Sequence, residues 1–175
     1  TIGGVGLIES ISILDNFGSL NIGDSIYMIG KRGSHLSCSA LEDVCNIESS
    51  INPPEIDLNQ EKLNGNGVLE LIQEKIITSC HDISDGGMIV AICEMIITCN
   101  RGATINIVDD NKMINELFGE DQSRYIITIL PELESIFEKK MKKRGVKYER
   151  IGCMTSSQLK INDNIIISNN EIRDA

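Results

Sequence analysis

The sequence is short of aromatic side chains, with three Phe, three Tyr and no Trp among 175 residues. It has only two histidines, and its six cysteines form no Cys-x-x-Cys pair. Single-stranded nucleic acids are held by stacking bases on aromatic rings, and structural zinc is held by four Cys or His ligands. The composition therefore disfavours both kinds of site. No run of 18 apolar residues occurs, which argues against a membrane-spanning helix and a membrane partner.

The chain is also poor in positive charge. Sixteen Lys and Arg stand against 26 Asp and Glu, so the formal net charge is −10 with both histidines neutral. Affinity for a phosphate backbone comes from a basic surface that displaces counterions, so we expect no nucleic-acid partner. A content of 41% hydrophobic and 24% charged residues is that of an ordinary globular protein, and the length suits one domain.

Cysteine usage and the first residues bear on where the protein works. Five of the six cysteines lie in apolar or helix-like segments, where free cysteine behaves as a small buried hydrophobe, so we expect a reducing, cytoplasmic location. Residues 1–6 have neither the positive charge nor the apolar core of an export signal. The chain begins on Thr in the middle of a pattern, and we expect residues 1–175 to be a single domain of a longer multidomain protein.

Apolar periodicity predicts a succession of strands and helices. Extended segments are predicted at 2–13, 25–30, 76–80, 103–107, 125–130, 146–151, 158–161 and 165–168, and helices at 39–45, 58–77, 86–98, 112–118 and 131–144. This order predicts an α+β domain, a layered α/β sandwich in which helices cover a mixed sheet. The segment at 2–13 is apolar enough to leave an exposed patch, which favours self-association.

The predicted helix at 86–98 is apolar on every face and carries Glu94 as its only charge. Such a helix is buried, and the N–H groups of its first turn need internal partners. Ser84 and Asp85 stand where an N-terminal cap is required, and we expect them to supply it.

One segment, His-Asp-Ile-Ser-Asp-Gly-Gly at 81–87, is dense in chemical groups. It places an imidazole, two carboxylates and a hydroxyl before glycines that allow close approach to a helix N-terminus. Its backbone N–H groups suit a phosphate, and Asp82 and Asp85 suit a hydrated Mg²⁺. The candidate cofactor-binding residues are His81, Asp82, Ser84, Asp85, Gly86 and Gly87. The alternative is structural, with Asp85 and Ser84 as caps, Asp82 tying down a loop and the glycines permitting tight packing.

A second polar segment, Phe-Gly-Glu-Asp-Gln-Ser-Arg, occupies 118–124. Carboxylates and amides accept hydrogen bonds from hydroxyls, and arginine forks onto phosphate, so the candidate substrate-binding residues are Glu120, Asp121, Gln122 and Arg124. The alternative is an acidic turn in which Arg124 pairs with Glu120 or Asp121. A Cys38/His35 nucleophile pair lacks an orienting third group, so no catalytic residue and no metal ligand is assigned.

These motifs, in this order, resemble the last domain of the phosphoribosylformylglycinamidine synthase family, ATP-dependent enzymes of purine biosynthesis. Segment 81–87 is followed by the apolar helix with Glu94, then by 117–124 and an apolar strand. The opening residues 2–8 and the segments 23–30 and 57–66 also fit. The resemblance covers almost the whole chain.

The resemblance implies a domain of the aminoimidazole ribonucleotide synthetase C-terminal type, in the second of the family's two copies. The implied reaction joins glutamine-derived ammonia to formylglycinamide ribonucleotide (FGAR) with ATP, through a phosphorylated amide, and yields formylglycinamidine ribonucleotide. ATP and Mg²⁺ are the implied cofactors. The implied partners are preceding ATP-site domains of the same chain, a glutaminase subunit and a small bridging subunit. The resemblance places the family's catalytic histidine, its Mg²⁺-binding acids and most of its ATP contacts in those preceding domains. We therefore expect the fragment alone to be inactive and its motifs to line the pseudo-symmetric or auxiliary face of the full enzyme.

Two departures from the family pattern concern loops that are usually glycine-rich. Ser34 and Ser37 stand where glycine is usual, and Ser156 and Ser157 where Gly-Gly is common. Their side chains disfavour close approach of a phosphate to these loops.

Three alternative functions stay open: a non-catalytic scaffold or auxiliary nucleotide-binding domain, another ATPase of the same fold superfamily, and an unrelated cytosolic ligand-binding domain. The segment 118–124 favours the synthase over the related sulfur- and selenium-handling ATPases, which lack it.

Overall fold

The computed structural model of the chain describes residues 6–7, 20–47, 52–162 and 164–175. Apart from residues 6 and 7, the predicted extended segment at 2–13 lies outside the described residues, and so does Asp163 of the predicted final turn.

Seven strands form one mixed sheet in the order β2-β4-β1-β5-β3-β6-β7. The strands are β1 (Ser25–Ile29), β2 (Ser79–Asp82), β3 (Gly102–Ile105), β4 (Tyr125–Ile129), β5 (Tyr148–Thr155), β6 (Leu159–Ile161) and β7 (Ile165–Ile167). β3 pairs with β6 in parallel, and the other neighbours pair antiparallel. The predicted mixed sheet is confirmed.

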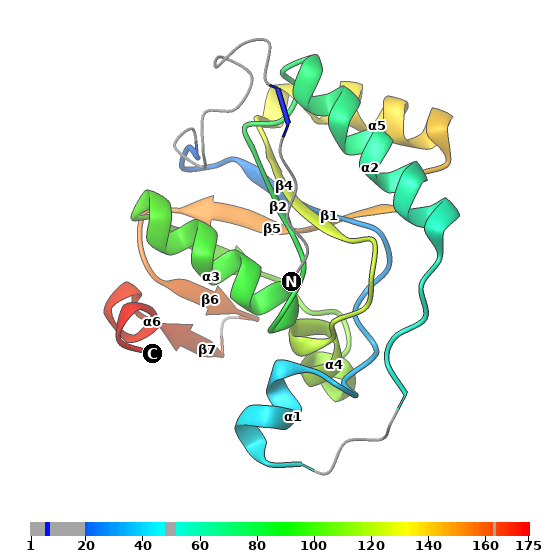
Figure 1. The fold of residues 1–175 in the computed structure, drawn as a ribbon. Helices are drawn as coiled ribbons and strands as arrows, with labels where there is room; N and C mark the ends of the chain where they lie inside the picture. The colour runs from blue at the N-terminus through cyan, green and yellow to red at the C-terminus, as the bar shows by residue number, and fades with distance from the viewer. Residues whose placement is uncertain (1–5, 8–19, 48–51, 163) are drawn as a thin grey trace.

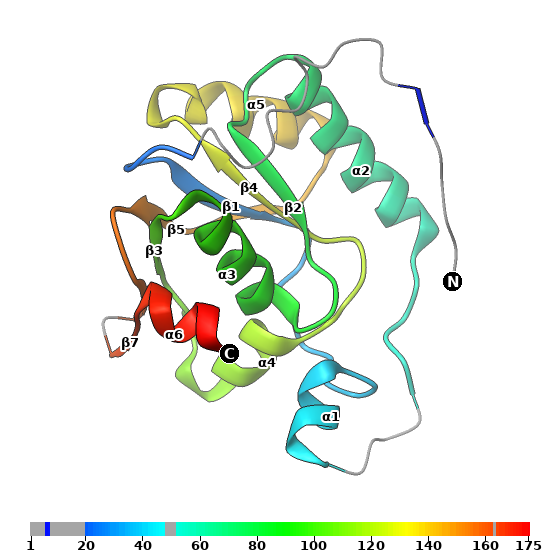
Figure 2. The same ribbon diagram turned by 60° about the vertical axis from the view of Figure 1, so that its left-hand side comes forward.

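Helices cover both faces of this sheet (Figures 1 and 2). The α-helices are α1 (Ala40–Cys45), α2 (Leu58–Gln73), α3 (Gly87–Cys99), α4 (Met113–Phe118), α5 (Glu134–Arg144) and α6 (Asn169–Asp174), and the 3-10 turns are η2 (Asp110–Lys112) and η3 (Pro131–Leu133). α3 and α6 pack on one face, and α2 and α5 pack on the other. The domain is thus the layered α+β sandwich that the sequence predicts.

Alternating side chains of β1 separate the two hydrophobic cores. Ile26 and Met28 join the core under α3, whereas Tyr27 and Ile29 join the core under α2 and α5. The second core holds three of the chain's few aromatic rings, with the Phe137 centroid 4.7 Å from that of Tyr27 and 5.0 Å from that of Tyr148. A strand that is buried on both faces fixes its register firmly, so the loop that follows β1 starts from a rigid base.

Some elements differ from the prediction. β2 begins at Ser79, later than the predicted strand at 76–80, because pairing with β4 extends it through His81 and Asp82. The final helix α6 was not predicted, although Ser168 and Glu171 form a capping box at its start. Cys38 and Cys45 are exposed and the other four cysteines are partly buried, so the expectation that five of the six are buried is met only in part. Within the described residues, no helix is long and apolar enough to span a membrane.

Candidate functional site

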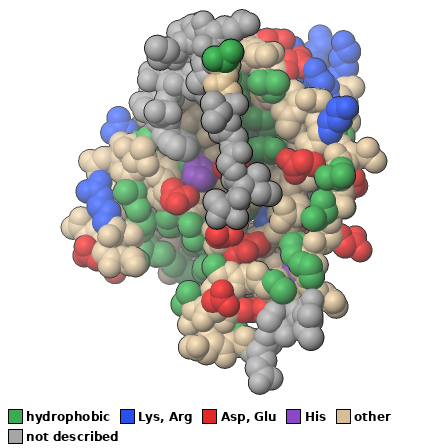
Figure 3. All heavy atoms as spheres, in the orientation of Figure 1, with side chains coloured by type: hydrophobic (Ala, Val, Ile, Leu, Met, Phe, Trp, Pro, Cys, Tyr) green, Lys and Arg blue, Asp and Glu red, His purple; other side chains and the backbone are tan. Residues whose placement is uncertain are grey.

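A pocket of about 340 Å³ lies where β2 leads into α3 and where the loop 119–124 leads into β4. We call it the acidic pocket. Its lining residues are Glu61, Asp82, Ile83, Ser84, Asp85, Glu120, Gln122, Ser123, Arg124 and Tyr125. Six of the ten predicted site residues are among them, so the structure brings the two predicted segments together. Acidic side chains gather between α3 and α1 on the face shown in Figure 3.

The N-terminal cap of α3, in the turn that follows β2, differs from the predicted one. Gly86 is the N-cap of α3 with φ +79°, and no side chain caps the helix from this position. Instead, Oε1 of Glu120 accepts a hydrogen bond of 2.8 Å from the Gly86 N–H. Ser84 and Asp85 are exposed. The expected capping by these two residues was therefore wrong, because a carboxylate from a distant loop takes that place.

Gly87 has a steric reason to be glycine. Its φ is +71°, and a Cβ there would lie 2.7 Å from the carbonyl carbon of Phe118 and 2.8 Å from the carbonyl oxygen of Gly119. The contacts are backbone atoms, which cannot move aside cheaply. The start of α3 is therefore packed tightly against the C-terminal end of α4, at residues 117–119, and this packing brings the two predicted segments together.

His81 lies against α3 and does not line the acidic pocket. Its Nε2 is 3.0 Å from a carboxylate oxygen of Glu94, and its Nδ1 is 2.6 Å from the backbone carbonyl of Asp82. The imidazole is 14% exposed. Both ring nitrogens thus face acceptors of the chain itself, which orients the imidazole beside the helix.

The Asp121 carboxylate is turned toward the loop after β1 and does not line the acidic pocket. Its Oδ2 accepts hydrogen bonds from the backbone N–H groups of Ser34 at 2.7 Å and His35 at 3.0 Å, and Oδ1 accepts from the Ser34 hydroxyl at 2.8 Å. Burial raises the pKa of Asp121, but these hydrogen bonds and the nearby Arg124 charge outweigh it, so the pKa lies below its ordinary value. Ser34, a departure from the family pattern, thus serves as a donor.

Arg124 is buried, with 2% of its surface exposed. Its Nε donates to the backbone carbonyl of Asp121 at 2.8 Å, and Nη2 donates to the carbonyl of Gly119. Burial lowers the Arg124 pKa, and the charges of Asp121 and Glu120 oppose that shift. No ion pair joins Arg124 to either acid among the described residues, so the guanidinium braces the backbone of its own loop.

A second pocket, of about 360 Å³, lies on the other side of this loop. Gln122, Ser123 and Arg124 line both pockets, so residues 122–124 form the wall between them. Asn64 of α2 holds this wall through a hydrogen bond to the backbone of Ser123, and it was not among the predicted site residues. Its buried neighbours in α2 are Gly67, Val68 and Leu71, so a polar residue on a buried helix face was the available signal.

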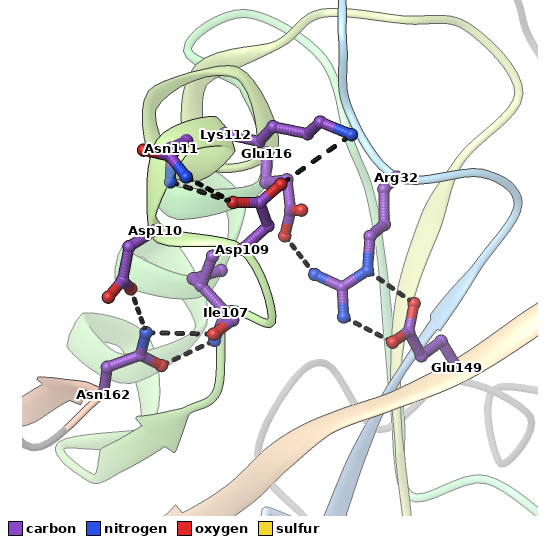
Figure 4. A network of polar contacts seen from close by, with 9 residues as sticks. All are labelled: Arg32, Ile107, Asp109, Asp110, Asn111, Lys112, Glu116, Glu149 and Asn162. Carbon is purple, nitrogen blue, oxygen red and sulfur yellow. Dashed lines mark hydrogen bonds and ion pairs between the residues drawn. The ribbon is translucent and has the colours of Figure 1, made fainter.

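A charge network that was not predicted anchors the loop after β1 (Figure 4). Arg32 donates from Nε to Glu149 at 2.8 Å, and its two other guanidinium nitrogens reach Glu149 and the buried Glu116. Its hydrogen bond to Glu149 is the main cause that raises the Arg32 pKa. This loop is therefore fastened to β5 and α4, and it provides a firm base for Ser34 and His35.

The acidic pocket is lined by two exposed carboxylates, Asp82 and Asp85, which are of the kind that binds a hydrated Mg²⁺. In the described parts of the chain, no group of three His, Cys, Asp or Glu side chains is placed to hold a metal. Mg²⁺ takes one or two carboxylates, and waters and phosphate oxygens complete its octahedron. The exposed pair Asp82 and Asp85 fits that requirement.

Comparison with known proteins identifies the family that shares this architecture. The profile of the family "AIR synthase related protein, C-terminal domain" matches residues 21–163. Curated relatives from Brucella ovis and Brucella canis, each named phosphoribosylformylglycinamidine synthase subunit PurL, are 36% identical over 170 residues. The match covers 96% of this chain and 23% of either relative.

Solved structures share the fold at low sequence identity. T. maritima PurL complexed with FGAR has a TM-score of 0.73 at 15% identity, over 93% of this chain and 30% of that one. The ATP complex of T. maritima PurL has a TM-score of 0.69 at 16% identity, over 93% and 27%. A thiamine-monophosphate kinase from Stenotrophomonas maltophilia reaches 0.61 at 15% identity, over 84% and 52%. The chain thus belongs to the AIR synthase related protein family, whose C-terminal domain it represents.

Proposed function

We propose that the chain is the last domain of a longer phosphoribosylformylglycinamidine synthase, which converts FGAR, ATP and glutamine-derived ammonia to formylglycinamidine ribonucleotide. The observation that carries this proposal is the 36% identity to synthase subunits across 96% of the chain. The thiamine-monophosphate kinase and T. maritima PurL both share the fold at 15% identity, so it is the 36% identity to synthase subunits that favours the synthase over another ATPase of this architecture.

Within that enzyme, we assign the acidic pocket to the nucleotide. Asp82 and Asp85 would hold the Mg²⁺ that accompanies the phosphates, and the exposed Gln122 amide, which also lines the pocket, would orient a polar group of the ligand. The ATP that phosphorylates the amide oxygen of FGAR would be held mainly by the preceding domains, and the acidic pocket would hold an auxiliary nucleotide. The residues of this domain bind and orient, and we assign none of them to proton transfer or nucleophilic attack.

The proposal extends to partners and location. One solved relative, PurLQS from Thermotoga maritima, is by its name an assembly of PurL with further components. We propose that the full protein likewise works in the cytoplasm with a glutaminase subunit and a small bridging subunit, and that preceding ATP-site domains cover this domain.

An activity assay tests the proposal. The complete product of the reading frame that encodes this chain should form formylglycinamidine ribonucleotide from FGAR, Mg-ATP and ammonium, whereas the 175-residue chain alone should not. ADP release that depends on both FGAR and ammonium is the readout. Synthase activity of the isolated chain, or no FGAR-dependent activity of the complete protein, would contradict it.

A further inference from the structure

We infer that Glu120 is a positioning residue that ties the start of α1 to the turn forming one wall of the acidic pocket. A single oxygen, Oε1, accepts hydrogen bonds of 2.8 Å from the backbone N–H of Ala40 and 2.8 Å from the backbone N–H of Gly86. Ala40 is the first residue of α1, and Gly86 is the N-cap of α3. One carboxylate therefore joins two helix N-termini that are far apart in the sequence.

Both helices need this contact for separate reasons. α1 buries none of its own residues, so apolar packing does not fix its position. α3 has no side-chain cap of its own, although its first turn is buried. A carboxylate at a helix N-terminus satisfies unpaired N–H groups and is favoured by the helix dipole. Glu120 meets the two needs at once.

The surrounding contacts hold Glu120 in place for this task. Its own backbone N–H donates to the carbonyl of His35 at 3.1 Å, and the next residue, Asp121, binds the N–H groups of Ser34 and His35. Asn115 also donates from Nδ2 to the Ser34 carbonyl at 2.9 Å. The Asp121 carboxylate thus occupies two backbone donors of the loop after β1, and the Glu120 carboxylate occupies that of Ala40, where the loop leads into α1. These are donors of the kind that a bound phosphate would use.

This inference changes the role of a predicted substrate-binding residue. Oε1 of Glu120 is engaged by the chain itself, and its effect on a ligand is indirect, through the turn that carries Ser84 and Asp85. The inference rests on the proposed function only in calling that turn a nucleotide wall. Its two tests use no nucleotide. They can therefore fail while the proposed function stands, and they can succeed while the proposed function fails.

The first test removes the Glu120 carboxylate by mutation and then supplies formate as a small replacement anion. Glu120→Ala should lower the melting temperature of the chain by roughly 5–10 °C, because two charge-assisted hydrogen bonds are lost. Sodium formate should then raise the melting temperature of the variant by about 3 °C more than sodium chloride of equal ionic strength, because formate fits the vacated space. The wild-type chain should respond equally to both salts.

The matched control is Glu42→Ala, which also removes a carboxylate that accepts from a backbone N–H. Oε2 of Glu42 binds the N–H of Cys38 at 2.7 Å, only four residues away, and bridges no distant segments. The fall in melting temperature for Glu42→Ala should be smaller than that for Glu120→Ala. An equal loss in the two variants, or a formate response of Glu120→Ala no greater than its chloride response, would overturn the inference.

The second test works even if Glu120→Ala does not fold. Glu120→Gln keeps the shape and weakens the acceptor, so the amide protons of Ala40 and Gly86 should both exchange faster with solvent, by at least about tenfold. The amides of Ser34 and His35, held by Asp121, should keep their wild-type rates. Faster exchange at only one of the two residues, or at neither, would show that Glu120 does not couple α1 to α3.

Discussion

Nδ2 of Asn64 donates a hydrogen bond of 2.7 Å to the backbone carbonyl of Ser123. Asn64 lies in the middle of α2 with no exposed surface, and Ser123 has a left-handed backbone with φ +64°. The bond joins a helix on one face of the sheet to the wall between the two pockets. The shape of that wall therefore depends on a buried amide that lies outside both predicted motifs.

Removing this amide should destabilise the domain. Asn64→Ala leaves the Ser123 carbonyl without this buried donor, so the free energy of unfolding should fall by about 1–3 kcal/mol in urea titrations. Asn66→Ala is the control, because Asn66 lies in the same helix and is exposed. A loss of unfolding free energy for Asn66→Ala as large as that for Asn64→Ala would contradict this account of the wall.

Acid should weaken the contribution of Asp121. Burial raises its pKa, but hydrogen bonds from His35 and Ser34 and the Arg124 charge bring the folded-state value below the ordinary one. A lowered folded-state pKa stabilises the domain above the unfolded-state pKa, and this stabilisation is lost as pH falls through the folded-state pKa. The difference in unfolding free energy between wild type and Asp121→Asn should be constant above about pH 5 and shrink below about pH 4.

Urea titrations of both proteins from neutral to acid pH measure that difference. A gap that stays constant into strong acid would show that the ionised carboxylate does not hold the loop after β1.

Two glycines with similar backbones should respond differently to alanine. Gly87 and Gly145 have φ +71° and +72°, but a Cβ on Gly87 would lie within 3 Å of backbone atoms, whereas a Cβ on Gly145 would face open space. Gly145→Ala should cost about 1–2 kcal/mol from the left-handed backbone, and Gly87→Ala should cost a further 1–3 kcal/mol, roughly, from overpacking. Equal melting temperatures for the two variants would refute the tight packing of α3 on the C-terminal end of α4.

Thiol reactivity should follow exposure and pKa. Burial raises the pKa of Cys80 to about 12 and that of Cys93 to about 11, so almost no thiolate is present at these positions near pH 8. Cys38 and Cys45 are exposed. Iodoacetamide should modify the exposed pair first, and Cys80 and Cys93 only after unfolding, as followed by peptide mass spectrometry. Early modification of Cys80 in the native chain would contradict the structure around β2.

The sequence predicted the elements that carry strong periodicity. The apolar helix at 86–98 became α3 with a shift of one residue, since burial on all faces leaves little choice of structure. β2 was displaced because its last residues, His81 and Asp82, are polar and become a strand only by pairing with β4. Such pairing is a tertiary contact and leaves no local pattern.

The candidate site was also predictable only where local sequence patterns mark it. Strand ends and glycines marked the two segments that meet at the acidic pocket. The partners of individual polar atoms were not predictable: Glu120 stands in a polar run, and nothing near it in the sequence indicates Ala40 and Gly86 as its donors. Asn64 was not predicted because it is one of several polar residues in an amphipathic helix, and only its spacing from the apolar positions of that helix distinguishes it from those that face solvent.

The nucleotide role of the acidic pocket is tested most directly by melting the chain with and without Mg-ADP. Asp85 caps no helix, so both Asp82→Asn and Asp85→Ala should leave the melting temperature of the ligand-free chain unchanged or slightly raised, because repulsion among carboxylates is relieved. Mg-ADP should raise the melting temperature of the wild type and of the control Asp174→Asn, at the exposed end of α6, and should have little effect on the two pocket variants. An Mg-ADP shift that is equal in all four proteins, or absent from the wild type, would contradict the assignment of this pocket to the nucleotide.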